Sequence, residues 1–217
     1  AELLGKALGT FTSRDYREKI VVGKDNKETS RPLKEALVKG LRSTGVNVID
    51  IGVGPTDFVA FSGRENDAVS VQVTSSHMPL DFNGFKFMYP EGNGFVNEDL
   101  YTVQDLFRDR EFDEGNGAVE KDAGAMDRYR GKLISFAENL GSDWDRKIVT
   151  DSLGGTGEIL PDILEKLGAE VIDLNDREGI YMDPPNPKPE KLDRLKEKVE
   201  EEDADLGIAN DLDADRI

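Results

Sequence analysis

The stretch KIVVG at residues 19–23 is a short β-branched run that ends in glycine, a pattern typical of a buried strand. Apolar residues then recur at helical spacing over residues 33–42, and Gly45 follows as a helix stop. The segment VNVIDIGV at residues 46–53 predicts the next strand. A strand–helix–strand unit of this kind predicts two parallel strands joined by a right-handed crossover.

The same pattern returns later in the chain. KIVT at residues 147–150 repeats the opening of the first strand, and GAEVIDL at residues 168–174 resembles the second. Further strands are predicted at residues 68–73 and 206–209, and chance similarity between two generic units is the alternative. We therefore expect an α/β protein with two successive mixed, mainly parallel βαβ-type sheet domains. Helices should cover both faces, the boundary should fall near residues 141–145, and the second domain should be incomplete.

Charge excludes several classes of protein. The 217 residues include 45 acidic and 28 basic side chains, which gives a net charge of −17. Such a field repels nucleic acid and anionic membranes, and no apolar run reaches the roughly 18 residues that cross a bilayer. The absence of cysteine suits a cytoplasmic protein. The acidity fits either an ordinary cytosolic enzyme or adaptation to high salt.

A polar loop follows the strand predicted at residues 68–73, at a position where α/β sheets bind ligands. The loop reads TSSHMP at residues 74–79 and contains Ser76 and the only histidine, His77. Adjacent Ser and His side chains usually point apart, and the G-x-S-x-G motif of serine hydrolases is absent. On composition alone, a plain serine-rich turn is an equal alternative.

A second polar loop, DLDADR at residues 211–216, follows the strand predicted at residues 206–209. Its three aspartates alternate along the chain, so their carboxylates can converge on a hard cation such as Mg²⁺. An EF-hand loop begins similarly, but it requires glycine in place of Arg216 and a glutamate further on. A solvated cluster of acidic side chains is the other alternative.

A glycine-rich turn, GGTG at residues 154–157, lies between a predicted strand and a predicted helix. The backbone N–H groups of such a turn can cradle a phosphate group. Tight packing against a neighbouring backbone also explains a lone glycine-rich turn, so the turn by itself assigns no ligand.

Together these loops resemble those of the α-D-phosphohexomutases, the family of phosphoglucomutase, phosphomannomutase and phosphoglucosamine mutase. The family's phosphoserine loop, T-A-S-H-N-P followed by N-G-x-K, is matched by residues 74–79 and by NGFK at residues 83–86. Its metal loop, D-G-D-A-D-R, is matched by residues 211–216. Shorter matches are VGKD at residues 22–25, PT at 55–56, PNP at 185–187, and GT at 9–10 with Arg14.

Three positions depart from the family pattern within these loops. Ser75 replaces alanine, Met78 replaces asparagine, and Leu212 replaces the glycine of the metal loop. Glycine tolerates a left-handed backbone, whereas leucine does not adopt it readily. A turn that requires a left-handed residue at Leu212 would therefore strain the metal site.

The resemblance implies that residues 1–140 form the domain of the phosphoserine loop and that residues 146–217 form a truncated domain of the metal loop. The chain would be the N-terminal half of a four-domain enzyme, inactive without its own missing C-terminal domains. That enzyme would move a phosphoryl group between the 1- and 6-positions of a hexose phosphate, through a phosphoserine and a hexose bisphosphate. Glucose, mannose and glucosamine phosphates all remain possible substrates.

The resemblance also assigns roles to individual residues. Ser76 would carry the phosphoryl group, and Lys86 would act as the general acid/base for the sugar hydroxyl. His77 would either share that role or hold the loop in place. The remaining site residues would bind charged groups: Arg14 and Arg216 the substrate phosphate, and Asp211, Asp213, Asp215 and phosphorylated Ser76 one Mg²⁺ per chain.

Two other classes remain open. Haloacid-dehalogenase-type phosphatases also place a D-x-D motif after a strand and use Mg²⁺, and Asp211 would then be phosphorylated itself. That fold has its D-x-D motif near the start of the chain, whereas here it lies at residues 211–213. The second class is a non-catalytic module that binds a divalent cation or a sugar phosphate.

Overall fold

The computed structural model describes residues 1–16, 19–141, 144–174 and 181–217. Its contacts divide the chain into two compact units, one of residues 1–74 and 84–125 and the other of residues 75–83 and 126–217. The sequence predicts a boundary near residues 141–145, whereas the contacts divide the chain between residues 125 and 126. Residues 142 and 143 lie outside the described residues. The contacts group helix α5 (Ala125–Asn139) almost entirely with the second unit.

A five-stranded sheet forms the centre of the first unit, in the order β4-β3-β1-β2-β5. Strand β1 lies in the middle, where its β-branched side chains are fully buried. The β1–β2 pair is parallel, as the sequence predicts, and only β4 runs antiparallel to its neighbour. The strands are β1 (Lys19–Lys24), β2 (Asn47–Val53), β3 (Val69–Thr74), β4 (Gly84–Met88) and β5 (Val119–Lys121).

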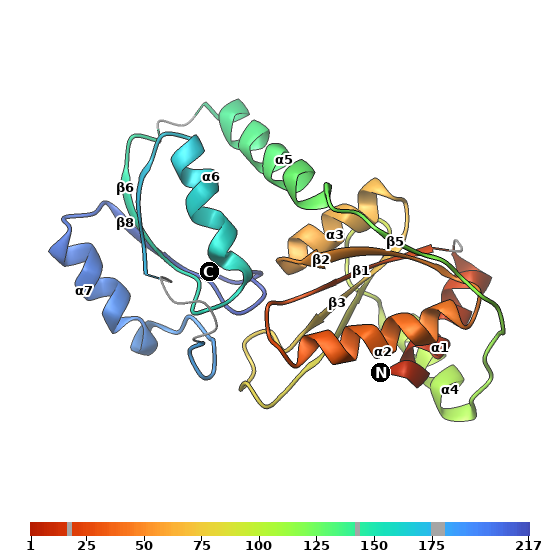
Figure 1. The fold of residues 1–217 in the computed structure, drawn as a ribbon. Coiled ribbons are helices and arrows are strands. Elements are labelled where there is room, and N and C mark those ends of the chain that lie inside the picture. The colour runs from red at the N-terminus through yellow and green to blue at the C-terminus, as the bar shows by residue number, and fades with distance from the viewer. Residues whose placement is uncertain (17–18, 142–143, 175–180) are drawn as a thin grey trace. The chain divides into compact units, whose positions relative to one another are not determined.

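Helices cover both faces of this sheet, as Figure 1 shows. Helices α1 (Glu2–Asp15) and α2 (Ser30–Arg42) lie on one face, and α3 (Thr56–Glu65) lies on the other. Helix α4 (Asn97–Asp109) packs against α1. Leu37 of α2 is fully buried in the core with Val22 of β1 and the valines of β3, so the periodicity that predicted α2 does mark its buried face.

Two glycines allow helices α1 and α2 to approach each other backbone to backbone. A Cβ atom at Gly5 would lie 2.2 Å from the carbonyl oxygen of Leu37, and one at Gly40 would lie 2.1 Å from that of Glu2. Neither carbonyl oxygen can move aside by a side-chain rotation, because both belong to helical backbone. We therefore expect Gly40→Ala to lower the free energy of unfolding by about 2–3 kcal/mol in urea denaturation.

Gly131 of helix α5 provides the control for this substitution. It is also helical, but apart from the backbone of its own helix no atom lies within 4 Å of the position its Cβ would take. Gly131→Ala should therefore be neutral, or stabilising by up to about 1 kcal/mol, because alanine favours helix over glycine. Equal effects of the two substitutions would show that the approach of α1 to α2 does not require glycine at position 40.

The second unit contains a parallel three-stranded sheet in the order β7-β6-β8. Strand β6 (Lys147–Asp151) lies between β7 (Glu170–Asp173) and β8 (Leu206–Ala209). The chain leaves β6 toward β7 on one side and later returns to β8 on the other. The carboxyl ends of β6 and β8 therefore flank a point where the strand order reverses, which is where open α/β sheets bind ligands.

Two helices cover the opposite faces of this sheet (Figure 1). Helix α6 (Leu160–Lys166) packs on the face of Ile148, and helix α7 (Asp193–Glu201) packs on the face of Val149. Two short 3₁₀ turns complete the unit, η1 (Thr156–Ile159) and η2 (Pro189–Lys191). The mainly parallel α/β architecture with helices on both sheet faces is thus confirmed.

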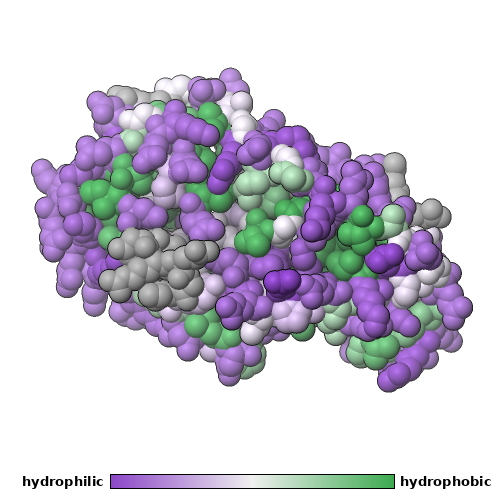
Figure 2. Space-filling view, viewed as in Figure 1, coloured by the Kyte–Doolittle hydropathy of each residue, from purple (hydrophilic) through white to green (hydrophobic). Residues whose placement is uncertain are grey.

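The surface agrees with the acidic composition. The face drawn in Figure 2 is mostly hydrophilic, and its apolar areas are small and separated from one another. Within the described residues, no helix is both long enough and apolar enough to cross a bilayer.

Candidate functional site

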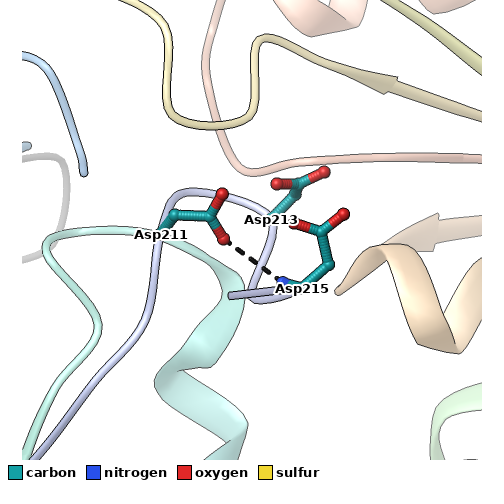
Figure 3. A group of neighbouring side chains, drawn as sticks. All are labelled: Asp211, Asp213 and Asp215. Carbon is teal, nitrogen blue, oxygen red and sulfur yellow. Dashed lines mark hydrogen bonds between the residues drawn. The ribbon is translucent and has the colours of Figure 1, made fainter. Parts of the chain in front are cut away.

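The acidic loop after strand β8 gathers three carboxylates (Figure 3). One oxygen each of Asp211, Asp213 and Asp215 lies within 4.8 Å of the others. Asp211 and Asp213 are 0% exposed, whereas Asp215 reaches solvent. The backbone N–H of Asp215 donates to Asp211 Oδ1 at 3.2 Å, which closes the loop. Two of the three carboxylates are therefore buried within a folded loop, and the third is exposed to solvent.

Leu212 fits this loop without a left-handed backbone. Its side chain is fully buried. Within the described part of the loop, the left-handed conformation falls on Ala214, at φ +52°, and not on Leu212. The replacement of glycine by leucine therefore introduces no such strain, because the turn requires a positive φ two residues later.

The donor set of this loop fits a hard divalent cation. Carboxylate oxygens are the ligands that Mg²⁺ prefers, and Asp211, Asp213 and Asp215 would be the residues that hold it. Two fully buried carboxylates this close together repel each other unless a cation offsets their charge. The Nε atom of Arg216 lies 3.8 Å from Asp211 Oδ2, but half of the Arg216 side chain is exposed to solvent. The arginine therefore neutralises the buried negative charge only in part.

The serine loop lies against the acidic loop within the second unit. The hydroxyl of Ser76 donates to Asp211 Oδ2 at 3.0 Å, and its Oγ lies 3.4 Å from His77 Nδ1. Further along the loop, the N–H of Leu80 donates to Asp183 Oδ1 at 3.0 Å. Ser76 has a left-handed backbone with φ +50°, which costs a non-glycine residue about 1–2 kcal/mol and is typical of functional sites.

Lys86 belongs to the first unit. It lies on the edge strand β4, paired in register with Gln72 of β3. With Thr56 and Asp57 at the start of α3, it lines a cavity of about 430 Å³. The structure therefore places this candidate at a cavity, and its acid/base role stays a prediction.

Arg14 also belongs to the first unit, near the end of helix α1. Its Nη2 lies 2.6 Å from Asp113 Oδ1, and its Nε donates to Asp113 Oδ2 at 3.2 Å. The hydrogen bond from Arg14 lowers the pKa of the Asp113 carboxyl. The guanidinium is thus held by a carboxylate, and binding of a phosphate by Arg14 stays a prediction.

Sequence reasoning missed two residues that support the acidic loop. Asn210 is buried directly before the loop, and its Nδ2 donates to the Arg216 carbonyl oxygen at 3.2 Å. Asp151 is the last residue of strand β6, and its carbonyl oxygen accepts the N–H of Asn210 at 3.0 Å. Its side chain accepts the Leu153 N–H at 2.9 Å, and burial raises the pKa of its carboxyl. A polar residue at the point where a predicted strand ends was the available signal for both.

Buried carboxylates that follow strand β8, with a serine hydroxyl hydrogen-bonded to one of them, define an α/β protein with a candidate cation site. Residues 1–114 match the family described as phosphoglucomutase/phosphomannomutase, alpha/beta/alpha domain I, and residues 127–217 match its domain II. The chain belongs to the phosphoglucomutase/phosphomannomutase family.

Known proteins are similar to the chain over nearly its whole length. It is 32% identical over 223 residues to a phosphoglucomutase/phosphomannomutase of Thermococcus kodakarensis, covering 98% of this chain and 49% of that protein. It is 34% identical over 220 residues to a probable phosphoglucosamine mutase of Thermococcus gammatolerans, covering 99% of this chain and 48% of that one. The chain therefore spans about half the length of these curated relatives.

A solved structure shows the same fold. The crystal structure of a phosphoglucomutase/phosphomannomutase family protein from Burkholderia thailandensis matches with a TM-score of 0.83 and 26% sequence identity. The match covers 98% of this chain and 48% of that one. Fold and family membership thus agree with each other.

Proposed function

We propose that the full-length protein containing this chain is a phosphohexomutase, an intramolecular phosphotransferase that moves a phosphoryl group between the 1- and 6-positions of a hexose phosphate. The observation that carries this proposal is the hydrogen bond from Ser76 to Asp211 within a buried group of carboxylates. Family membership supports the class of reaction.

In this proposal, Ser76 carries the phosphoryl group between turnovers. A sugar hydroxyl attacks the phosphorus in line, the bond from phosphorus to Ser76 Oγ breaks, and a hexose bisphosphate forms. The bisphosphate reorients, Ser76 Oγ attacks its other phosphoryl group, and the isomeric monophosphate leaves. Asp211 holds the serine hydroxyl in position through the 3.0 Å hydrogen bond. When bound, Mg²⁺ would offset the negative charge of the phosphoryl group and of the aspartates.

Basic residues move protons and bind phosphate in this scheme. Lys86 accepts the proton of the attacking sugar hydroxyl and gives it to the sugar oxygen that is released in the second transfer. His77, whose Nδ1 lies 3.4 Å from Ser76 Oγ, either holds the serine loop or shares the proton transfer. Arg14 and Arg216 bind the substrate phosphate, for which a guanidinium offers paired N–H donors.

The geometry disfavours a phosphatase of the haloacid-dehalogenase type. Its nucleophile would be Asp211, which is 0% exposed. One carboxylate oxygen already accepts the Ser76 hydroxyl, and the other accepts the Asp215 N–H. Attack by Asp211 on a phosphoryl group would therefore have to displace one of these two hydrogen bonds.

The assay that tests the proposal follows glucose, mannose and glucosamine 1-phosphates by phosphorus NMR. We expect the full-length protein, with Mg²⁺ and a trace of the matching bisphosphate, to convert at least one of them to its 6-phosphate. Inorganic phosphate should not accumulate, because the acceptor is the sugar and not water. Stoichiometric release of inorganic phosphate would contradict the mutase and favour the phosphatase, and residues 1–217 alone should turn over none of the three.

A further inference from the structure

The glycine-rich turn after strand β6 lies beside the acidic loop after strand β8. The two strands pair in parallel, with Asp151 opposite Ala209, so both loops leave the same edge of the sheet. The turn is tight, since Gly154 has φ +85° and the N–H of Gly155 donates to the Ser152 carbonyl oxygen at 2.7 Å. This geometry brings the backbone of the turn against the backbone of the acidic loop at Leu212.

One carbonyl of the acidic loop receives two hydrogen bonds from this turn. The N–H of Thr156 donates to the Leu212 carbonyl oxygen at 2.8 Å, and the Thr156 hydroxyl donates to the same oxygen at 3.1 Å. Thr156 is 1% exposed. Both Thr156 donors are thus used within the protein, so neither of them serves as a cradle for phosphate.

Close backbone packing accompanies these hydrogen bonds. A Cβ atom at Gly155 would lie 2.5 Å from the Leu212 carbonyl oxygen and 2.6 Å from the Leu212 Cα. A Cβ atom at Gly157 would lie 3.0 Å from Asn210 Oδ1. A side chain at Gly155 would therefore push the acidic loop away from the turn.

Leu212 is the residue between the two fully buried carboxylates, Asp211 and Asp213. A fixed Leu212 carbonyl fixes the peptide plane that leads into Asp213, and so limits where that carboxylate can lie. We propose that Thr156 is a positioning residue for the cation site, which it orients through the Leu212 carbonyl. This inference rests on the metal site of the proposed function. Gly155 contributes by lacking a side chain, which leaves room for the hydrogen bonds between Thr156 and the Leu212 carbonyl.

The test measures binding of Mn²⁺, as a probe for Mg²⁺, by electron paramagnetic resonance of the protein in solution. Thr156→Val removes the hydroxyl donor and keeps the shape, so we expect the Kd for Mn²⁺ to rise about fivefold. Thr156→Ser retains the donor and should stay within about twofold of the wild type. Thr156→Ala should raise the Kd as Thr156→Val does, and it replaces that variant if valine impairs folding.

A matched control separates positioning from general stability. Thr150 is also a buried threonine near the end of β6, but its hydroxyl donates to Asp173 at 3.0 Å and not to the acidic loop. Thr150→Val should lower the unfolding midpoint in urea and leave the Kd for Mn²⁺ unchanged. An unchanged Kd in both Thr156→Val and Thr156→Ala, with a wild type that binds Mn²⁺, would overturn the positioning role alone. A wild type that does not bind Mn²⁺ would overturn the metal site and this inference with it.

Discussion

We expect Ser76→Ala to abolish a phosphoryl adduct of the full-length protein and to lower kcat/KM for isomerisation by about 10⁴-fold or more. The expected loss is large because the substitution deletes the oxygen proposed to accept and donate the phosphoryl group, which is also the hydroxyl that donates to Asp211. Intact-mass measurement after incubation with a hexose 1,6-bisphosphate detects the adduct. A coupled assay for the 6-phosphate measures kcat/KM.

The adjacent serine gives this prediction a matched control. Ser75 is buried as Ser76 is, and it stands where the phosphohexomutase loop has alanine. Ser75→Ala should therefore keep the adduct and reduce kcat/KM by no more than a few-fold. An adduct that persists in Ser76→Ala, or that disappears in Ser75→Ala instead, would assign the phosphoryl group to a different residue.

The clearest strand signals in the sequence come from strands that are buried on both faces. The run of isoleucine and valine in β1 is fully buried because helices cover both sides of the sheet, and this produces a continuous β-branched signal. Strand β3 is buried as well, but its valines alternate with Ser70 and Gln72. Strand β5 gives no such signal, since all of its side chains are exposed. Helix α4 was missed for a related reason, because Val103 is its only fully buried residue.

The candidate site could be predicted in part, because Ser76 and Asp211 each lie in a polar loop that follows a predicted strand. Strands β3 and β8 belong to different sheets, so the strand pattern does not predict that the two loops meet. Their approach, with a hydrogen bond of 3.0 Å between residues 135 positions apart, is expected only from the family resemblance. The loop conformations could not be predicted in this way. The turn that contains Leu212 is shaped by two hydrogen bonds from Thr156, a tertiary contact that the motif itself does not encode. The pairing of Arg14 with Asp113 likewise joins distant segments that share no pattern.

Asp213→Asn should change the stability of the chain in opposite directions with and without Mg²⁺. Asp213 is 0% exposed and one of its oxygens lies within 4.8 Å of oxygens from Asp211 and Asp215. In a chelator, loss of one buried negative charge relieves repulsion, so the free energy of unfolding should stay equal or rise. With Mg²⁺, loss of a ligand should raise the Kd for Mg²⁺ about 100-fold.

Urea denaturation of the wild type and the variant, each with and without Mg²⁺, measures both effects. At a Mg²⁺ concentration of about 100 times the wild-type Kd, binding stabilises the wild type by about 2.7 kcal/mol. A variant with a Kd about 100 times higher gains only about 0.4 kcal/mol at that concentration. Glu197→Gln, on the exposed surface of helix α7, removes the same charge away from the site and should keep the full wild-type gain. If Mg²⁺ stabilised Asp213→Asn as much as the wild type, the cation would bind elsewhere and the acidic loop would not be its site.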